Sequence, residues 1–198
     1  SPLDALRLAQ ENPDRQIVFV GVGFETTTPL VAMAIKRARA MGLANFTVYG
    51  AHKNMPGALE VIINDPALKL DALILPGHVS TIIGAEPYRF LAEKYGIPGV
   101  ITGFEPVDVL QGIAMIMRQL HEGRAEIEIA YARGVMPEGN PVALAAIDEV
   151  FETCSATWRG LGEIPGSGYR IREEFADFDA MRRFQPDVEE VREHKGCS

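Results

Sequence analysis

A short phrase that occurs twice constrains the fold of this chain more than any other feature. Gly-Phe-Glu occupies residues 23–25 and again residues 103–105, so the glutamates Glu25 and Glu105 lie about 80 residues apart. Each copy follows a short apolar run rich in β-branched residues and precedes a pattern with helical periodicity. The repeat therefore predicts two strand–turn–helix joints, each with one glutamate where the strand ends. In open α/β sheets, ligands bind at that edge.

Strand and helix patterns alternate through the first 122 residues. Apolar strands are expected at residues 17–22, 46–49, 72–75 and 99–102, and a helical pattern follows each of them. This order predicts a parallel sheet with helices on its faces. Because parallel strands all end at the same edge, one edge is expected to collect the loops that contain Glu25, His52, His78 and Glu105. The helix expected at residues 106–121 has a clear amphipathic pattern, with apolar Val109, Leu110, Ile113, Met117 and Leu120.

The second half of the chain has a different character. Residues 125–131 alternate charged and apolar side chains, as a half-exposed strand does, and a helix is expected from residue 141 to residue 151. Residues 157–172 are rich in Gly and Pro. We assign residues 1–122 to α/β structure that carries the motifs, residues 123–172 to the remainder of a second α/β lobe, and residues 173–198 to a connector.

Composition narrows the functional classes. The net charge of −8 and the pI near 5.1 argue against non-specific binding of nucleic acid, which requires a basic surface. No apolar run approaches the length of a membrane span, and the N-terminal residues lack the pattern of a signal peptide. The two cysteines, Cys154 and Cys197, do not make a disulfide framework. A cytoplasmic protein is expected.

The sequence lacks an initiator Met and stops just after a charged segment, so we expect a fragment of a longer protein.

Glu25 and Glu105 are the leading candidates for chemistry. A glutamate near the N-terminus of a helix is favoured by the helix dipole whatever its purpose, so either residue alone has a purely structural explanation. The dipole does not require Gly-Phe in front of the glutamate, however, and both copies have it. The repetition therefore favours a functional role.

Pro76-Gly77-His78-Val79-Ser80-Thr81 is the second candidate segment. His78 can act as an acid, a base or a metal ligand, and the Gly77 turn exposes amides that could meet an anion. The structural alternative is that Ser80 caps a short helix and His78 is an ordinary loop residue. The hydroxyls of Thr26, Thr27 and Ser80 are expected at the same edge, and helix capping would explain some of them. The His52–Lys53 pair is a weaker candidate.

Four motifs, in this order and at these spacings, resemble the HypD family of [NiFe]-hydrogenase maturation proteins. They are GFETTTP at 23–29, PGHVSTIIG at 76–84, GFEPVDVLQGI at 103–113 and WRGLGEIPGSG at 158–168. The resemblance covers roughly residues 1–197. No G-x-G-x-x-G fingerprint, P-loop or G-x-S-x-G elbow accompanies these motifs.

The resemblance implies a cytoplasmic α/β protein with two Rossmann-like lobes, whose parallel sheets are flanked by helices and which enclose a cleft. It also implies a separate part that carries a [4Fe-4S] cluster. With the small partner HypC, such a protein is the scaffold on which the Fe(CN)2CO unit is assembled, and HypE delivers the cyanide. Whether the scaffold is itself an enzyme, with a redox or ligand-transfer role, stays open. The residues that would surround the iron are Glu25, Thr26, Thr27, His78, Ser80 and Glu105.

The sequence departs from the family pattern in one respect. The N-terminal Cys-Gly-Thr-His motif, whose cysteine is thought to hold the iron, is absent, as is nearly all of the cluster-binding tail. Cys197 lies where the first cluster ligand is expected, but a cluster needs about four thiolates. The chain by itself is therefore expected to bind neither the cluster nor the iron with full competence, and we assign no metal ligand.

Two other functional classes remain open at this point. In one, the acids and His78 act on a small molecule without a metal, in an enzyme of the doubly wound α/β type. A phosphate or dinucleotide fingerprint would favour that class, and the sequence has none. In the other, the chain is mainly a module that docks partner proteins, because its C-terminal part has few residues suited to chemistry.

Overall fold

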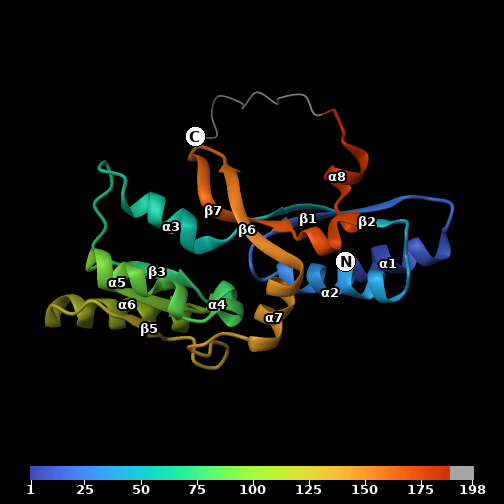
Figure 1. The fold of residues 1–198 in the computed structure, drawn as a ribbon. Helices are drawn as coiled ribbons and strands as arrows, with labels where there is room; N and C mark the ends of the chain where they lie inside the picture. Colours follow the sequence, from blue (N-terminus) through green and yellow to red (C-terminus); the bar gives the residue numbers. More distant parts are fainter. Residues whose placement is uncertain (188–198) are drawn as a thin grey trace. The chain divides into compact units, whose positions relative to one another are not determined.

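Strands and helices alternate along the chain in the computed structural model, which describes residues 1–187 (Figure 1). The first half contains α1 (Pro2–Glu11), β1 (Ile17–Gly23), α2 (Thr28–Ala40), β2 (Phe46–His52), α3 (Met55–Ile63), β3 (Leu73–Pro76), α4 (Gly77–Ile83), η1 (Glu86–Tyr88), α5 (Arg89–Tyr95) and β4 (Gly99–Thr102). The second half contains α6 (Pro106–Glu122), β5 (Ile127–Ile129), α7 (Pro141–Val150), β6 (Phe151–Trp158), β7 (Gly162–Ile171), η2 (Glu173–Phe178) and α8 (Ala180–Phe184). The predicted α/β class, with parallel sheets flanked by helices, is confirmed. None of the helices in residues 1–187 has both the length and the apolar character needed to cross a membrane.

The chain forms two compact units, which we describe separately. Unit 1 contains residues 1–54 and the segment that begins at Ala146, and unit 2 contains residues 55–145. The lobes assigned from the sequence follow the chain order, whereas unit 1 combines the two ends of the chain. It does so because β7 packs against β2. The cleft expected between two lobes stays a prediction.

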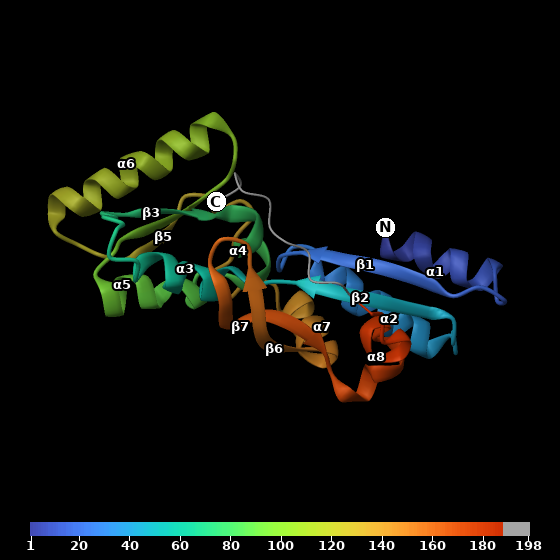
Figure 2. The same ribbon diagram turned by 90° about the horizontal axis from the view of Figure 1, so that it is seen from above.

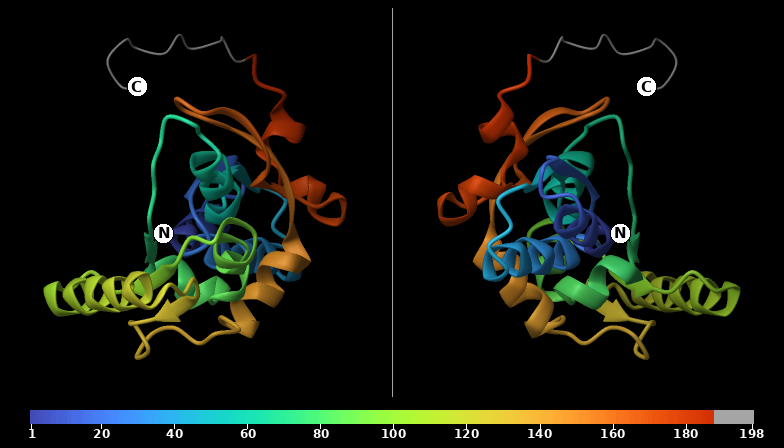
Figure 3. Two further views of the ribbon diagram at one scale, coloured as in Figure 1. Left: turned by 90° about the vertical axis from the view of Figure 1, so that its left-hand side faces the viewer. Right: turned by 90° about the vertical axis from the view of Figure 1, so that its right-hand side faces the viewer.

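Unit 1 is built on the parallel pair β1–β2, aligned from Ile17 opposite Phe46 to Gly23 opposite His52. The first helix begins at Pro2, where Ser1 and Asp4 form a capping box and proline occupies the first turn. β6 and β7 form an antiparallel hairpin, which the Gly- and Pro-rich sequence of residues 157–172 did not reveal. Figure 3 shows this hairpin in orange, followed by η2 and α8 in red.

Unit 2 is built on the parallel sheet β3–β4–β5. One face of this sheet packs against a core of α3, α4, η1 and α5 side chains around Leu75 and Ile101. The helix α6 packs on the other face. The packing is close, since a methyl group added at Gly112 of α6 would lie 2.2 Å from the Thr102 side chain of β4. Figure 2 shows α6 on the opposite side of the sheet from α5.

The sequence prediction is wrong in one respect. The β1–β2 and β3–β4–β5 strands belong to separate sheets, so one sheet edge does not collect all four predicted loops. The predicted helix α6 is present, and it contacts its sheet through its less apolar side. Its buried residues are Asp108, Gly112, Ile116 and Gln119, whereas Leu110, Ile113, Met117 and Leu120 are exposed.

Candidate functional site

The first Gly-Phe-Glu turn is held by glycine and threonine side chains. Gly23 has φ +145°, and a Cβ there would lie 2.3 Å from Thr27 Oγ1, so the position requires glycine. The hydroxyls of Thr27 and Thr28 both donate to the Phe24 carbonyl, at 3.0 and 2.9 Å. They therefore close the turn, and Thr27 makes no side-chain hydrogen bond as the N-cap of α2. Thr26 is exposed.

Glu25 lies inside unit 1, with only 1% of its surface exposed. Its charge reaches the half-buried Tyr169 on β7: burial raises the pKa of the Tyr169 phenol, and the negative charges of Glu25 and Asp148 raise it further. The predicted site residue is therefore a buried carboxyl group whose charge acts on Tyr169 of β7.

His52 is a second buried titratable group in the same unit. It lies opposite Gly23 in the β1–β2 register and is 2% exposed. Its ring contacts Phe151 edge-on, at 5.9 Å between centroids, and a Cβ on Gly21 would lie 2.6 Å from its Cε1 atom. Neither ring nitrogen has a hydrogen-bond partner among the described residues. Burial lowers the pKa of His52 to about 4, so the ring is neutral at physiological pH.

The WRGLGEIPGSG segment (residues 158–168) forms the tip of the β6–β7 hairpin and contacts the residues that follow β2. The Lys53 ammonium lies 4.9 Å from the centre of the Trp158 ring, and Trp158 Nε1 donates to Ser167 Oγ at 2.8 Å. Asn54 donates from its backbone N–H to the Ser167 carbonyl and from Nδ2 to the Gly166 carbonyl. The Phe24 ring of the first turn lies 6.0 Å from the Trp158 ring. The hairpin thus fixes the loop after β2 and contacts the first Gly-Phe-Glu turn.

The second turn, in unit 2, is an ion-pair network. Arg133 Nη1 and Nη2 donate to the two carboxylate oxygens of Asp108, at 2.7 and 2.6 Å. The same guanidinium lies 2.9 Å from Glu105 Oε2. Arg133, and a hydrogen bond with Glu105, lower the pKa of Asp108 to about 2. The Asp108 carboxylate therefore stays ionised at any physiological pH.

His78 lies beside this network, on α4 instead of the loop that the sequence predicted. Its exposed ring contacts the Phe104 ring edge-on, with 4.6 Å between the centroids, and its centroid lies 6.5 Å from that of Tyr131. The Arg133 guanidinium in turn lies over the Tyr131 ring, 4.6 Å from its centroid. Ser80 is buried, and its hydroxyl donates to the Pro76 carbonyl at 2.9 Å. Ser80 therefore stabilises the first turn of α4 and does not reach solvent.

The two units divide the predicted site residues between them. Unit 1 brings Glu25, Thr26 and Thr27 together, and unit 2 brings His78, Ser80 and Glu105 together. The two glutamates have opposite environments, because Glu25 is buried whereas the Glu105 side chain is 62% exposed. The exposed imidazole of His78, near the carboxylates and guanidinium of the second turn, can donate or accept a proton and can hydrogen-bond a small anion.

Sequence reasoning missed several residues of these clusters. Asp108 was visible as the last residue of Gly-Phe-Glu-Pro-Val-Asp, five positions after the glycine that its carboxylate approaches. Tyr131, Arg133 and Tyr169 carry no motif signal, because they come from segments distant in the sequence. Their role depends on packing that the sequence pattern alone does not show.

The described residues do not suit an iron–sulfur cluster. No group of three or more His, Cys, Asp or Glu side chains in residues 1–187 has the arrangement of a metal site. Cys154 is the one cysteine in this range, and burial raises the pKa of its thiol, which disfavours the thiolate. Cys197, the predicted first cluster ligand, lies outside the described residues.

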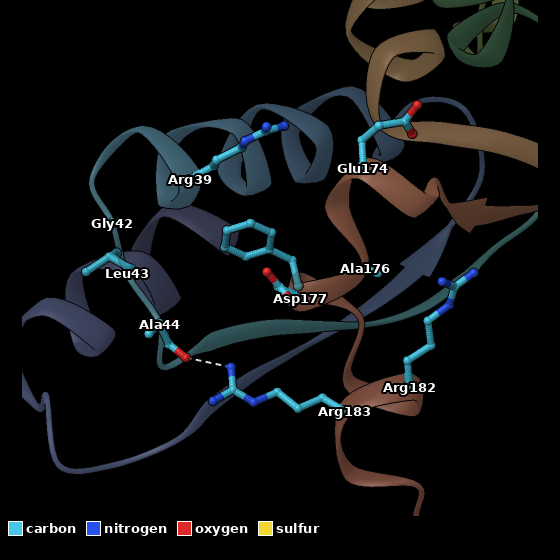
Figure 4. Close-up of a pocket in the computed structure, with 10 residues that line it drawn as sticks. Arg39, Gly42, Leu43, Ala44, Glu174, Ala176, Asp177, Arg182 and Arg183 are labelled. Atoms are coloured by element: carbon cyan, nitrogen blue, oxygen red, sulfur yellow. Dashed lines mark hydrogen bonds between the residues drawn. The ribbon is translucent and has the colours of Figure 1, made fainter.

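A surface pocket of about 700 Å³ lies elsewhere in unit 1, between the end of α2 and the η2–α8 segment (Figure 4). Arg183 points across it and donates to the Ala44 carbonyl. Both signs of charge line the pocket, with Arg39 and Arg182 as further cations and Glu174 and Asp177 as anions. None of the predicted site residues belongs to it.

Comparison with known proteins agrees with the motifs. The profile of the HypD family, described as "Hydrogenase formation hypA family", matches residues 1–198. The hydrogenase maturation factor HypD of Rhodobacter capsulatus is 53% identical over 185 residues, which are 93% of this chain and 49% of the relative. The proteins of the same name from Azotobacter vinelandii and Rhizobium leguminosarum bv. viciae are 48% and 44% identical to it. These two matches cover all of this chain and 54% and 53% of the relatives' own length. The chain spans about half the length of these relatives. It belongs to the HypD family of hydrogenase maturation factors.

Proposed function

We propose that this chain works in the maturation of [NiFe] hydrogenases, as part of a HypD protein that carries the Fe(CN)2CO unit during its assembly. In this proposal HypC is the partner that completes the scaffold, and HypE supplies the cyanide. A [4Fe-4S] cluster and the thiolates for the iron would come from other parts of the polypeptide. A cytoplasmic location belongs to the same proposal. The observation that carries it is the family match over residues 1–198, together with relatives named for hydrogenase maturation.

The geometry of unit 2 supports a role in handling a small, iron-bound ligand. His78 is exposed and can protonate or hydrogen-bond a diatomic ligand such as cyanide, whose nitrogen accepts hydrogen bonds. The Arg133 guanidinium holds the carboxylates of Glu105 and Asp108 in place through charge-assisted hydrogen bonds and ion pairs. We infer that His78 acts on the ligand and that Glu105 and Arg133 set the charge around it.

Glu25 has a different part in the proposal. Because it is buried, it is a positioning residue for the turn that carries Thr26 and Thr27, with its charge directed toward Tyr169. Its loss is therefore expected to disturb the first turn, whereas loss of His78 is expected to remove a reacting group. The metal-independent enzyme of doubly wound α/β type has no observation of its own in its favour.

Complementation of cells that lack HypD tests the proposal. In the full-length protein, His78→Ala or Glu25→Gln is expected to lower hydrogenase activity at least tenfold, in line with the general acid–base contributions of roughly 10²–10⁴ seen in enzymes. His121→Ala is the matched control, since His121 is exposed in the last turn of α6, and it should leave activity unchanged. The level of soluble protein is measured in every strain. Normal activity with His78→Ala at normal protein level would refute the role of unit 2.

A further inference from the structure

The pocket between α2 and the η2–α8 segment of unit 1 contains charged side chains that are not used in ion pairs. Arg39 and Arg183 line it, and within residues 1–187 neither guanidinium group is paired with a carboxylate. Glu174 and Asp177 line it as well, and neither carboxylate has a cationic partner in the same range. Figure 4 shows Arg39 extending from α2 on one side of the pocket and Arg183 reaching across from α8. Charges of both signs therefore face the same space without neutralising one another.

Both unpaired guanidinium groups are held in place by aromatic rings. The Arg39 Cζ atom lies 5.0 Å from the centre of the Phe175 ring, and the Arg183 Cζ atom lies 5.6 Å from the centre of the Phe184 ring. Arg183 Nη1 also donates a hydrogen bond to the Ala44 carbonyl. Stacking on a ring restricts a guanidinium group and leaves its other N–H groups able to donate. The two arginines are thus positioned for a ligand that accepts hydrogen bonds.

The wall that carries Arg183 is fixed by its own interactions. Asp179 caps α8, where its carboxylate accepts from the Met181 N–H at 2.9 Å. Arg182 also lines the pocket, but its guanidinium is paired with Glu173 and Asp179. Phe178 supplies an apolar part of the lining and is only 9% exposed. The pocket therefore combines a packed frame with polar groups that are available for binding.

The balance of these charges indicates what kind of molecule would fit. Two unpaired cations and two unpaired anions sum to zero, so neither a simple anion nor a simple cation satisfies all four. A guanidinium group binds a carboxylate through two parallel hydrogen bonds, and an Asp or Glu carboxylate accepts from an ammonium or guanidinium group. The volume of about 700 Å³ is within the range of small-molecule sites. A small molecule that carries both signs of charge would complement this lining.

We propose that this pocket binds a zwitterionic small molecule of the amino-acid type. Its carboxylate is bound by Arg39 and Arg183, and its cationic group is bound by Glu174 and Asp177. No residue of the two Gly-Phe-Glu turns lines the pocket. The inference therefore goes beyond the proposed function and does not depend on it.

Calorimetric titration of the full-length protein with L-arginine tests the proposal. L-Arginine carries a carboxylate and two cationic groups, whereas acetate and methylammonium, used at the same ionic strength, each carry one charge. We expect saturable binding of L-arginine at one site, with a dissociation constant of about 1 mM or lower. Acetate and methylammonium are expected to bind at least about tenfold more weakly, because each satisfies charges of one sign only. Absence of saturable L-arginine binding, or acetate binding of equal strength, would overturn the proposal.

Substitutions on both sides of the pocket locate the binding. Arg183→Gln and Asp177→Asn should each weaken L-arginine binding about tenfold, since each removes a charge-assisted hydrogen bond. Asp177→Asn keeps the shape of an exposed side chain, so it tests the site even if Arg183→Gln disturbs α8. The matched control is Arg37→Gln, because Arg37 is exposed on α2 two positions before Arg39 and lies outside the pocket.

The melting curve of each variant, followed by circular dichroism, confirms that it is folded. An unchanged affinity in Asp177→Asn, or an equal loss in Arg37→Gln, would place the binding elsewhere and overturn the proposal. Because the titration measures binding and not hydrogenase maturation, this inference and the proposed function can fail independently of each other.

Discussion

Acidification is expected to destabilise unit 1 through a single buried group, His52. The folded protein holds this histidine neutral, with its pKa lowered from 6.5 to about 4 by burial. In the unfolded chain the ring is solvated and has its ordinary pKa. Between pH 6.5 and pH 4 the unfolded state therefore binds more protons than the folded state. The stabilising contribution is complete above pH 6.5 and is lost as the pH falls through this window.

The size of the effect follows from the two pKa values. A difference of this size corresponds to about 3 kcal/mol over the full window, at about 1.4 kcal/mol per pH unit. Between pH 7 and pH 5, where most carboxylates are still ionised, the linkage relation gives a loss of about 2 kcal/mol. Such a loss is a large fraction of the stability of an ordinary domain.

Urea unfolding at pH 7 and pH 5 measures this loss. The fluorescence of Trp158, the single tryptophan of the sequence, reports on unit 1, which also contains His52. In His52→Gln, the drop in the free energy of unfolding between the two pH values should be about 2 kcal/mol smaller than in the parent chain. His121→Gln, at an exposed position, should behave like the parent. The same pH dependence in His52→Gln and the parent would refute the reasoning.

Two further predictions concern unit 2. Arg133→Gln should raise the pKa of Asp108 from about 2 toward its ordinary value of 3.8, because the guanidinium is the main cause of the depression; a carboxyl NMR titration checks this, and an unchanged value would contradict it. Gly77→Ala should lower the thermal stability by at least the roughly 1–3 kcal/mol typical of overpacking, since its Cβ would lie 2.1 Å from the Thr102 carbonyl oxygen. An unchanged melting curve by circular dichroism would show that this backbone contact relaxes freely.

The sequence was a good guide where one local rule decides the structure. The strands before both Gly-Phe-Glu turns follow from their apolar runs, and the structure has them. It was a poor guide to α6, because the amphipathic stripe of that helix does not face its own sheet. Periodicity identifies an apolar stripe, but it does not say what covers that stripe.

The candidate site was predicted in part for a similar reason. The motif residues Glu25, His78 and Glu105 could be selected because their spacing from a strand end is visible in the sequence. The burial of Glu25 could not, since it depends on a hairpin that begins 126 residues later, at Phe151. Arg133 was equally hidden, because an arginine in an irregular segment has no pattern until its partner is known.

The difference between the two Gly-Phe-Glu turns follows from the residues that come after them. In the second turn Pro106 follows the glutamate directly, and its fixed φ starts α6 at once, so Glu105 becomes the N-cap residue and stays at the surface. In the first turn Thr26 and Thr27 separate the glutamate from α2. The chain then continues for two residues before the helix begins, and Glu25 turns into the interior. The repeated phrase thus fixes the place where each strand ends, whereas the position of the helix start decides whether its carboxylate meets solvent or the core.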